Sequence, residues 1–214
     1  MNERIIIGLG GRRYSGKDAL ADYLVQDHGY TKHEMSSVLN EIMGIINPWV
    51  VVYEDIEGFD PGTLTRYKDL VTHVGYVKAK EVNEVRRLLQ ALGTEVGRNI
   101  LHPDVWVNVM REKILATEGH VVFTGVRYPN ELALVRELSG VAAWVERPGV
   151  DGHQAELAAH SSESSVCAED FDVKVVNDSD LDGLRRLANE MHMATSTQDA
   201  RLFLKKEEVH GGAS

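Results

Sequence analysis

GGRRYSGKDALADYL, residues 10–24, directly follows the apolar run IIIGL and decides how the N-terminal part of the chain folds. The apolar run predicts a buried strand, and apolar residues at helical spacing from 19 to 25 predict a helix. Between them, the pattern G-x-x-x-x-G-K from Gly11 to Lys17 is typical of a phosphate-binding loop. In such a loop, backbone N–H groups and the positive end of the helix hold the phosphates, and the lysine reaches the outer ones.

Other glycine motifs do not fit the stretch. Arg13 occupies the third glycine position of a dinucleotide-binding fingerprint, and it also replaces the first glycine of a G-x-S-x-G hydrolase turn around Ser15. One departure from the phosphate-loop pattern is Asp18, which stands where a Ser or Thr usually contacts magnesium. The remaining alternative is a strand-to-helix turn with an exposed lysine.

Composition limits the kind of protein. With 214 residues, 43% of them hydrophobic, the chain can bury one good core, most simply as one domain with insertions. A formal net charge of -10 argues against binding a nucleic-acid polymer. No apolar run approaches the length of about 18 residues that spans a membrane, so we expect a cytoplasmic protein. The one cysteine, Cys167, is expected to be a small buried side chain rather than a nucleophile.

Five short, apolar, β-branched segments alternate with helical patterns, which predicts a parallel sheet covered by helices in a three-layer α/β fold. The expected spatial order of the strands is 2-3-1-4-5. The predicted strands are residues 4–9, 30–35, 120–124, 141–146 and 171–176. The predicted helices are residues 16–28, 38–46, 81–99, 103–117, 130–138 and 180–191.

Three segments fall outside this alternation. Residues 44–80 are punctuated by proline and glycine and predict a helical insert, and residues 147–170 predict a lid-like flap. The tail, 195–214, is expected to be frayed. The domain prediction is therefore a single domain over 1–194.

Seven segments, in this order, carry a family resemblance: SGKDALADYL, VRRLLQALGTEVGR, DVWVN, VVFTGVRYPNE, WVERPG, GHQAELAAHSSES and VVNDSDLDGL. Together they resemble the bacteriophage deoxynucleoside monophosphate kinases over most of residues 4–190, with 44–80 and the tail poorly matched. The family typically has Asp-Thr after the loop lysine, so Asp18 agrees and Ala19 departs. It usually ends the third strand with Asp-x-Arg, where this chain has Gly125 before Val126 and Arg127.

The loop motif and the resemblance together imply a P-loop kinase fold that uses ATP and Mg²⁺. The residues assigned to ATP are Gly11, Arg13, Ser15, Gly16, Lys17, Asp18 and Ala19, with Asp18 as the nearest carboxylate for the metal. The residues assigned to catalysis are Lys17, Arg127 and Arg147. Those assigned to the monophosphate are Arg86, Gly93, Thr94, Trp106 and Arg127. For Trp106, a face for the base and a core aromatic are both open.

The resemblance implies transfer of the γ-phosphoryl group of ATP to a deoxynucleoside monophosphate (dNMP), giving ADP and the diphosphate (dNDP). Two alternatives remain: a related small-molecule kinase, such as one acting on dephospho-coenzyme A, and a nucleotide-binding protein that has lost turnover because of Ala19 and Gly125. His160 and Glu163 are expected to be flap contacts. A homodimer is left open, and a phage protein would work in the cytoplasm of the infected host.

Overall fold

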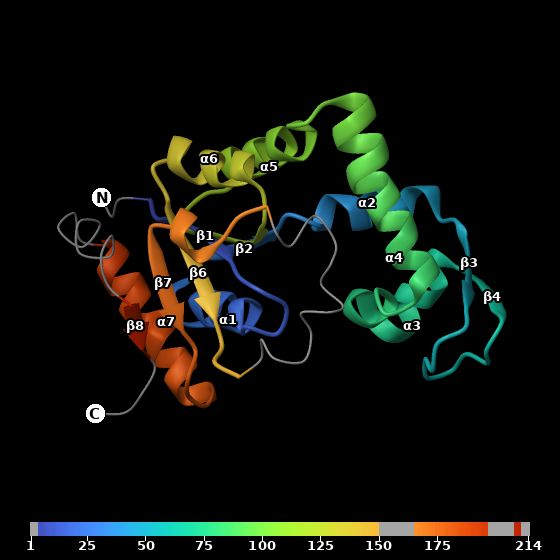
Figure 1. Cartoon of the computed structure of the whole chain (residues 1–214), viewed down its shortest axis with the longest axis horizontal. Helices are drawn as coiled ribbons and strands as arrows, with labels where there is room; N and C mark the ends of the chain where they lie inside the picture. Colours follow the sequence, from blue (N-terminus) through green and yellow to red (C-terminus); the bar gives the residue numbers. More distant parts are fainter. Residues whose placement is uncertain (1–3, 150–164, 197–207, 211–214) are drawn as a thin grey trace. The chain divides into compact units, whose positions relative to one another are not determined.

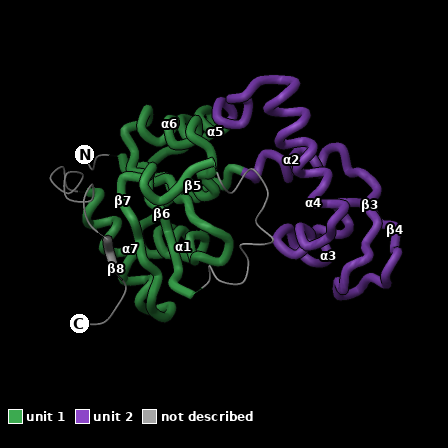
Figure 2. The backbone as a smooth tube through the Cα atoms, viewed as in Figure 1, with its two compact units in different colours: residues 1–35, 110–214 green, residues 36–109 purple. Residues whose placement is uncertain are grey.

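The structure is a computed structural model that describes residues 4–149, 165–196 and 208–210. It divides into two compact units, residues 1–35 with 110–214 (unit 1) and residues 36–109 (unit 2) (Figure 2). Unit 2 contains the predicted insert and extends beyond it at both ends. His160 and Glu163, with most of the predicted flap, lie outside the described residues.

Unit 1 is built on a parallel sheet of order β2-β5-β1-β6-β7-β8. Its strands are β1 (Ile6–Gly10), β2 (Thr31–Glu34), β5 (Val121–Val126), β6 (Val141–Glu146), β7 (Val173–Val176) and β8 (Glu208–His210). The predicted α/β class and the order of the five predicted strands are confirmed. The sheet has one further strand, β8, which pairs with β7. The expectation of a frayed tail is wrong for these residues, because sheet pairing outweighs their weak strand pattern.

Helices cover both faces of this sheet (Figure 1). On one face, α1 (Lys17–His28) and α7 (Leu181–Ser196) pack against each other and against the strands. On the other lie α6 (Pro129–Glu137) and the part of α5 (Val105–Ala116) from Met110 onward. The first face holds a fully buried apolar cluster that includes Ile7, Leu9, Leu20, Leu24 and Leu187. All five residues of β1 are buried, so the loop that follows it starts from a rigid strand.

Unit 2 combines helices with a two-stranded antiparallel hairpin, which the prediction of a helical insert did not include. The hairpin pairs β3 (Trp49–Val52) with β4 (Thr63–Arg66). The helices are α2 (Ser37–Ile46), α3 (Tyr67–Ala79) and α4 (Asn83–Gln90), followed by the π-helix η1 (Ala91–Leu101). They enclose a second core around Tyr67, Leu70 and Val85. The predicted helix 81–99 therefore changes its hydrogen-bonding pattern at Ala91, a change that propensity does not reveal.

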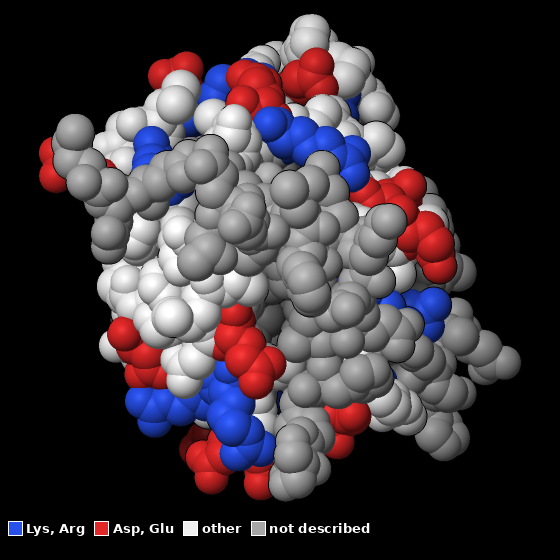
Figure 3. Space-filling view, turned by 90° about the vertical axis from the view of Figure 1, so that its left-hand side faces the viewer, with Lys and Arg blue, Asp and Glu red and all other residues white. Residues whose placement is uncertain are grey.

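Surface charges agree with the acidic composition. On the face drawn in Figure 3, the described Lys and Arg side chains are interspersed with Asp and Glu and form no broad basic area. Among the described helices, none combines the length and apolarity that crossing a membrane requires. Cys167 is exposed rather than buried, which corrects the sequence expectation. Hydrogen bonds to Glu169 and then Asp170 raise the pKa of the thiol, which keeps it a poor nucleophile.

Three histidines and a tyrosine cluster near the N-terminal ends of the strands. The glycine-rich loop lies at the opposite, C-terminal end of the sheet. The rings of His28 and His192 stack with centroids 3.9 Å apart, and Tyr30 Oη lies 3.1 Å from His192 Nδ1. Nδ1 of His120 accepts a hydrogen bond from the backbone N–H of Ile5. Burial, followed by the nearby His28, lowers the pKa of both His120 and His192.

This cluster predicts a loss of stability in acid. A histidine with a lowered folded-state pKa binds more protons in the unfolded chain, so the free energy of unfolding falls as the pH drops below about 6.5. We expect His192→Gln to make the fall in urea midpoint from about pH 7.5 to 5 shallower than in the unaltered protein. His102→Gln is the control, because that side chain is 62% exposed. Parallel midpoint curves for His192→Gln and the unaltered protein would contradict this account.

Candidate phosphate-binding site

The glycine-rich loop leaves the C-terminal end of β1 and turns into α1. Gly16 caps the helix with φ +94°, and Gly11 and Tyr14 also have positive φ. A Cβ at Gly11 would lie 2.2 Å from the backbone oxygen of Val145, so only glycine fits there. The chain therefore forms the predicted strand, loop and helix, with the N-terminus of a 12-residue helix at the loop. The free N–H groups and dipole of such an end attract anions.

Ser15 gives independent support for an anion at this helix end. Its side chain is 2% exposed, and Oγ is buried without a hydrogen-bond partner among the described residues. A buried hydroxyl without a partner costs free energy, and native proteins usually provide one. A phosphate oxygen in the loop would accept this hydrogen bond. The loop therefore has the chemistry of an oxyanion site.

Lys17 is placed in the first turn of α1 and is 7% exposed. Its Nζ lies 3.7 Å from Oδ2 of Asp18, whose side chain is 56% exposed. Keeping a lysine this buried favours a close negative partner, which bound phosphates supply. The structure thus brings together Gly11, Ser15, Gly16, Lys17 and Asp18 of the predicted ATP residues.

The two other predicted ATP residues lie differently. Arg13 is exposed, and its guanidinium carbon lies 4.9 Å from the ring centroid of Tyr14. Ala19 is half-buried and packs against the apolar cluster beneath α1. These contacts do not direct either side chain to the phosphates.

The residues around the loop offer few ligands for magnesium. Asp18 is the carboxylate in the first turn of α1, and among the described residues no group of three or more His, Cys, Asp or Glu could hold a metal by itself. Mg²⁺ commonly binds through one or two carboxylates together with substrate phosphates and waters. The donor set therefore fits a metal that enters with a nucleotide.

At the end of β5, Arg127 is exposed and its backbone is tightly held. Oε2 of Glu131 accepts hydrogen bonds from the N–H groups of Arg127, at 2.7 Å, and Tyr128, at 3.2 Å. Glu131 is 2% exposed, and it forms a capping box at the start of α6. Sequence reasoning missed this residue, although a Glu two positions after Pro129 at a helix start is a capping signal.

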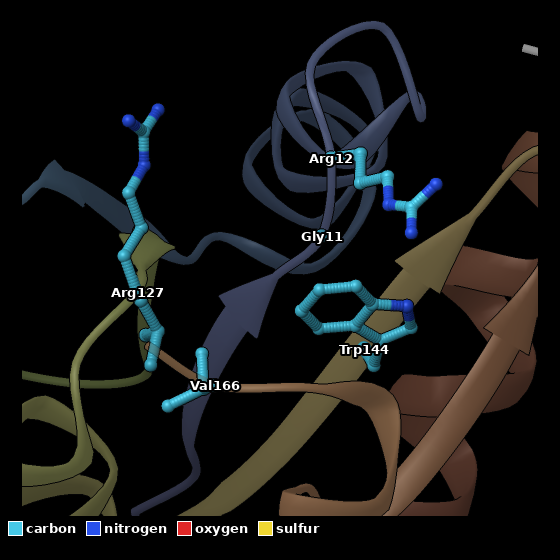
Figure 4. Close-up of a pocket in the computed structure, with 6 residues that line it drawn as sticks. Gly11, Arg12, Arg127, Trp144 and Val166 are labelled. Atoms are coloured by element: carbon cyan, nitrogen blue, oxygen red, sulfur yellow. The ribbon is translucent and has the colours of Figure 1, made fainter. Parts of the chain in front are cut away.

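A shallow hollow lies beside the loop (Figure 4). It is lined by Gly11, Arg12, Val126, Arg127, Trp144 and Val166. The Arg12 guanidinium lies next to the Trp144 indole, whereas the Arg127 side chain extends away from it. The sequence prediction named Arg13 and omitted Arg12 and Trp144.

The predicted monophosphate residues of unit 2 have mixed environments. Arg86 and Thr94 are exposed, and Gly93 is buried. Trp106 is 7% exposed, and its Nε1 donates a hydrogen bond to the Gly93 carbonyl at 2.7 Å. These contacts fit the core role left open for Trp106, and its role as a face for the base stays a prediction. Arg147, on unit 1, is exposed just after β6.

Gly125 stands where the family has the aspartate of Asp-x-Arg, and its backbone conformation favours glycine. It has φ +86° beside a bulge in the β1–β5 pairing, where Gly10 pairs with Val126. The nearest atom to a built Cβ is Met35 Cβ at 3.7 Å, so backbone conformation, not space, favours glycine. An aspartate here would need either a strained backbone or a different strand end.

Introducing an aspartate at position 125 is therefore not expected to increase activity. We expect Gly125→Asp to lower the free energy of unfolding by about 1–3 kcal/mol without speeding any turnover of ATP. Gly119→Asp is the matched control for the cost of the backbone conformation, because Gly119 also has a positive φ, +74°, and open space around it. Chemical denaturation and initial rates measure the two effects. A stable Gly125→Asp protein with faster turnover would overturn this explanation.

The parallel sheet, its strand order and the loop at the end of β1 define a P-loop α/β protein of the kinase type. A family model described as deoxynucleotide monophosphate kinase matches residues 46–187. The chain therefore belongs to the deoxynucleotide monophosphate kinase family, and the family predicted from the sequence is confirmed.

Relatives from three viruses carry kinase names. The deoxynucleoside-5'-monophosphate kinase of Escherichia phage T5 is 31% identical over 111 residues, which cover 50% of this chain and 44% of that protein. A putative deoxynucleotide monophosphate kinase of Acanthamoeba polyphaga mimivirus is 24% identical, covering 83% and 91%. The deoxynucleotide monophosphate kinase of Enterobacteria phage T4 is 21% identical, covering 84% and 95%. The match to the T5 protein thus spans less than half of its length.

Proposed function

We propose that this protein transfers the γ-phosphoryl group of ATP to a deoxynucleoside monophosphate, giving ADP and the diphosphate. The observation that carries the proposal is the loop of unit 1, where a buried Lys17 lies at the start of α1 beside Ser15, whose Oγ has no hydrogen-bond partner within the described part of the chain. Membership of the kinase family supports the choice of acceptor. ATP, the proposed donor, carries the phosphates that such a loop binds. The proposed place of action is the cytoplasm of the infected cell.

The reaction needs little covalent chemistry from the protein. An oxygen of the acceptor's phosphate bonds to the γ-phosphorus, and the bond from that phosphorus to the β,γ-bridging oxygen breaks. The electron pair leaves with ADP, and no protein group is alkylated or phosphorylated. The protein contributes alignment of the two anions and stabilisation of the charge on the transferred group.

Each part of unit 1 has a role in this scheme. Backbone N–H groups of the loop and Ser15 Oγ hold the donor phosphates, while Lys17 reaches the β- and γ-oxygens. Arg127 binds the acceptor phosphate from the end of β5, and Arg147 contacts the transferred group from the start of the flap. Asp18 is the carboxylate that would hold Mg²⁺, directly or through water, and the metal when bound would supply positive charge to the ATP oxygens.

The unit 2 residues Arg86, Gly93, Thr94 and Trp106 remain predictions for the acceptor site, from the resemblance. The single domain with a flap over 147–170, and the homodimer, also remain proposals. Two alternative functions stay in view: a kinase for another small phosphate acceptor, and a nucleotide-binding protein without turnover.

A panel of acceptors tests the function. The unaltered protein is incubated with ATP and Mg²⁺ plus each deoxynucleoside monophosphate, dephospho-coenzyme A, or no acceptor, and ADP release is followed by a coupled assay. We expect ADP release to depend on one or more of the deoxynucleoside monophosphates. Release only with dephospho-coenzyme A supports the first alternative. Saturable ATP binding without ADP release in any tube supports the second.

A further inference from the structure

Asn177, directly after β7, forms a hydrogen bond to the glycine-rich loop that follows β1. It follows β7, where its backbone N–H donates to the Glu146 carbonyl at 2.8 Å. Its side chain is 3% exposed, and Nδ2 donates a hydrogen bond to the backbone oxygen of Ser15 at 3.0 Å. The two residues are 162 positions apart in the chain. A buried amide therefore holds one particular peptide of the loop.

Packing keeps that peptide in place. A Cβ built on Gly16 would lie 2.4 Å from Asn177 Nδ2 and 3.6 Å from Cδ2 of Leu184, on α7. The last residue of the loop is thus pressed directly against the amide of Asn177. Gly16 also has φ +94°, a conformation that other residues adopt only with strain.

The geometry of the peptide unit gives this contact a consequence at the site. The chain has no cis peptide bonds among its described residues, so the Ser15–Gly16 peptide is trans. In a planar trans peptide, C=O and N–H point in opposite directions. Because the Ser15 carbonyl points to Asn177, the N–H of Gly16 points away from Asn177.

We propose that Asn177 is a positioning residue for phosphoryl transfer: it fixes the Ser15–Gly16 peptide so that the Gly16 N–H donates to the donor phosphates. The inference rests on the proposed function, because it assigns a ligand to that N–H. Asn177 itself touches no nucleotide. Its effect passes through the backbone it holds.

The first experiment measures whether Asn177→Ala impairs the use of ATP or the binding of the monophosphate. Removing an oxyanion donor outright costs about 10²–10³ in rate, so misdirecting one donor by Asn177→Ala is expected to lower kcat/KM for ATP by about 10- to 100-fold. The KM for the deoxynucleoside monophosphate is expected to stay within about twofold. Asn189→Ala is the matched control, because Asn189 is an exposed residue of α7 whose Oδ1 bonds His28. If Asn177→Ala lowers only the urea midpoint and leaves kcat/KM for ATP unchanged, the proposal is overturned.

A second variant, Asn177→Asp, is tested by the pH dependence of its ATP affinity. A purely structural role of Asn177 would not change that dependence. Asn177→Asp keeps the shape, but an ionised carboxylate cannot donate to the Ser15 carbonyl. Its protonated form can donate, and burial beside a carbonyl oxygen raises the pKa of a carboxyl group. Relative to the unaltered protein at each pH, ATP affinity of Asn177→Asp should recover as the pH is lowered from 8 toward 5.5, because the protonated fraction of a carboxyl group with a raised pKa grows over this range. A constant ratio across this range would contradict the proposal, even if Asn177→Ala fails to fold.

Failure of this inference can be told from failure of the proposed function. If the unaltered protein neither binds ATP nor forms ADP with any acceptor, the function itself is wrong. If the unaltered protein is active and both Asn177 variants match it in ATP affinity, only the role of Asn177 is wrong.

Discussion

Lys17→Ala is expected to abolish phosphoryl transfer while leaving the fold intact. The lysine is 7% exposed at the first turn of α1, where its charge can reach the β- and γ-phosphates. Losing a preorganised cation from a transferring phosphate removes transition-state stabilisation, so we expect kcat to fall by about 10³-fold or more. The helix should persist, because alanine has the highest helix propensity. ADP formation in a coupled assay and a urea denaturation curve measure the two quantities.

Lys68→Ala is the control for Lys17→Ala. Lys68 is an exposed residue of α3 in unit 2, and its removal deletes the same charge from the protein. We expect that variant to keep the unaltered rate. If Lys17→Ala turned over ATP and dNMP at the unaltered rate, the assignment of the loop as the donor site would be wrong.

Arg127→Ala is expected to give the second largest effect, mainly through the acceptor. Glu131 holds the backbone of Arg127 at the end of β5, where ligands of open parallel sheets gather, and the side chain is exposed and extends outward. A guanidinium there can bind a phosphate through two hydrogen bonds. We expect kcat/KM for the monophosphate to fall by about 100-fold, a loss of about 2.7 kcal/mol in transition-state binding.

Two comparisons sharpen the Arg127 result. Arg127→Lys keeps the charge without the two-pronged donor, so it should recover only part of the rate. Arg186→Ala removes an exposed arginine of α7 and should behave as the unaltered protein. An equal fall in kcat/KM for ATP and for the monophosphate, with no change in monophosphate KM, would argue that Arg127 serves the donor instead.

The strand order could be predicted because the local signals agree. β1, β5 and β6 are short apolar runs with mostly buried residues, and β1 and β5 are each followed by a helix, which favours parallel pairing. β8 could not be predicted, because Glu208–His210 has no apolar pattern and forms a strand only by pairing with β7. The β3–β4 hairpin was missed because Gly58, Pro61 and Gly62, its turn residues, were read as breaks in a helical insert.

The site was predictable where the motif is continuous in sequence. Gly11, Ser15, Gly16 and Lys17 come from one loop, and their spacing alone placed them together. Asn177 is brought to the same place only by the fold, since its hydrogen bond to Ser15 crosses 162 residues. No spacing or periodicity in the sequence links the two residues. A polar residue directly after a buried strand was the available hint, because strand ends of parallel sheets meet ligands at one edge.

The direct test of the central claim is identification of the product. The unaltered protein is mixed with Mg²⁺, ATP labelled in its γ-phosphate and each of the deoxynucleoside monophosphates, and the nucleotides are separated. We predict that label appears in a deoxynucleoside diphosphate in step with ADP, and that Lys17→Ala forms neither. Label that remains in ATP with every monophosphate, or that appears only as free phosphate, would contradict the assignment as a deoxynucleoside monophosphate kinase.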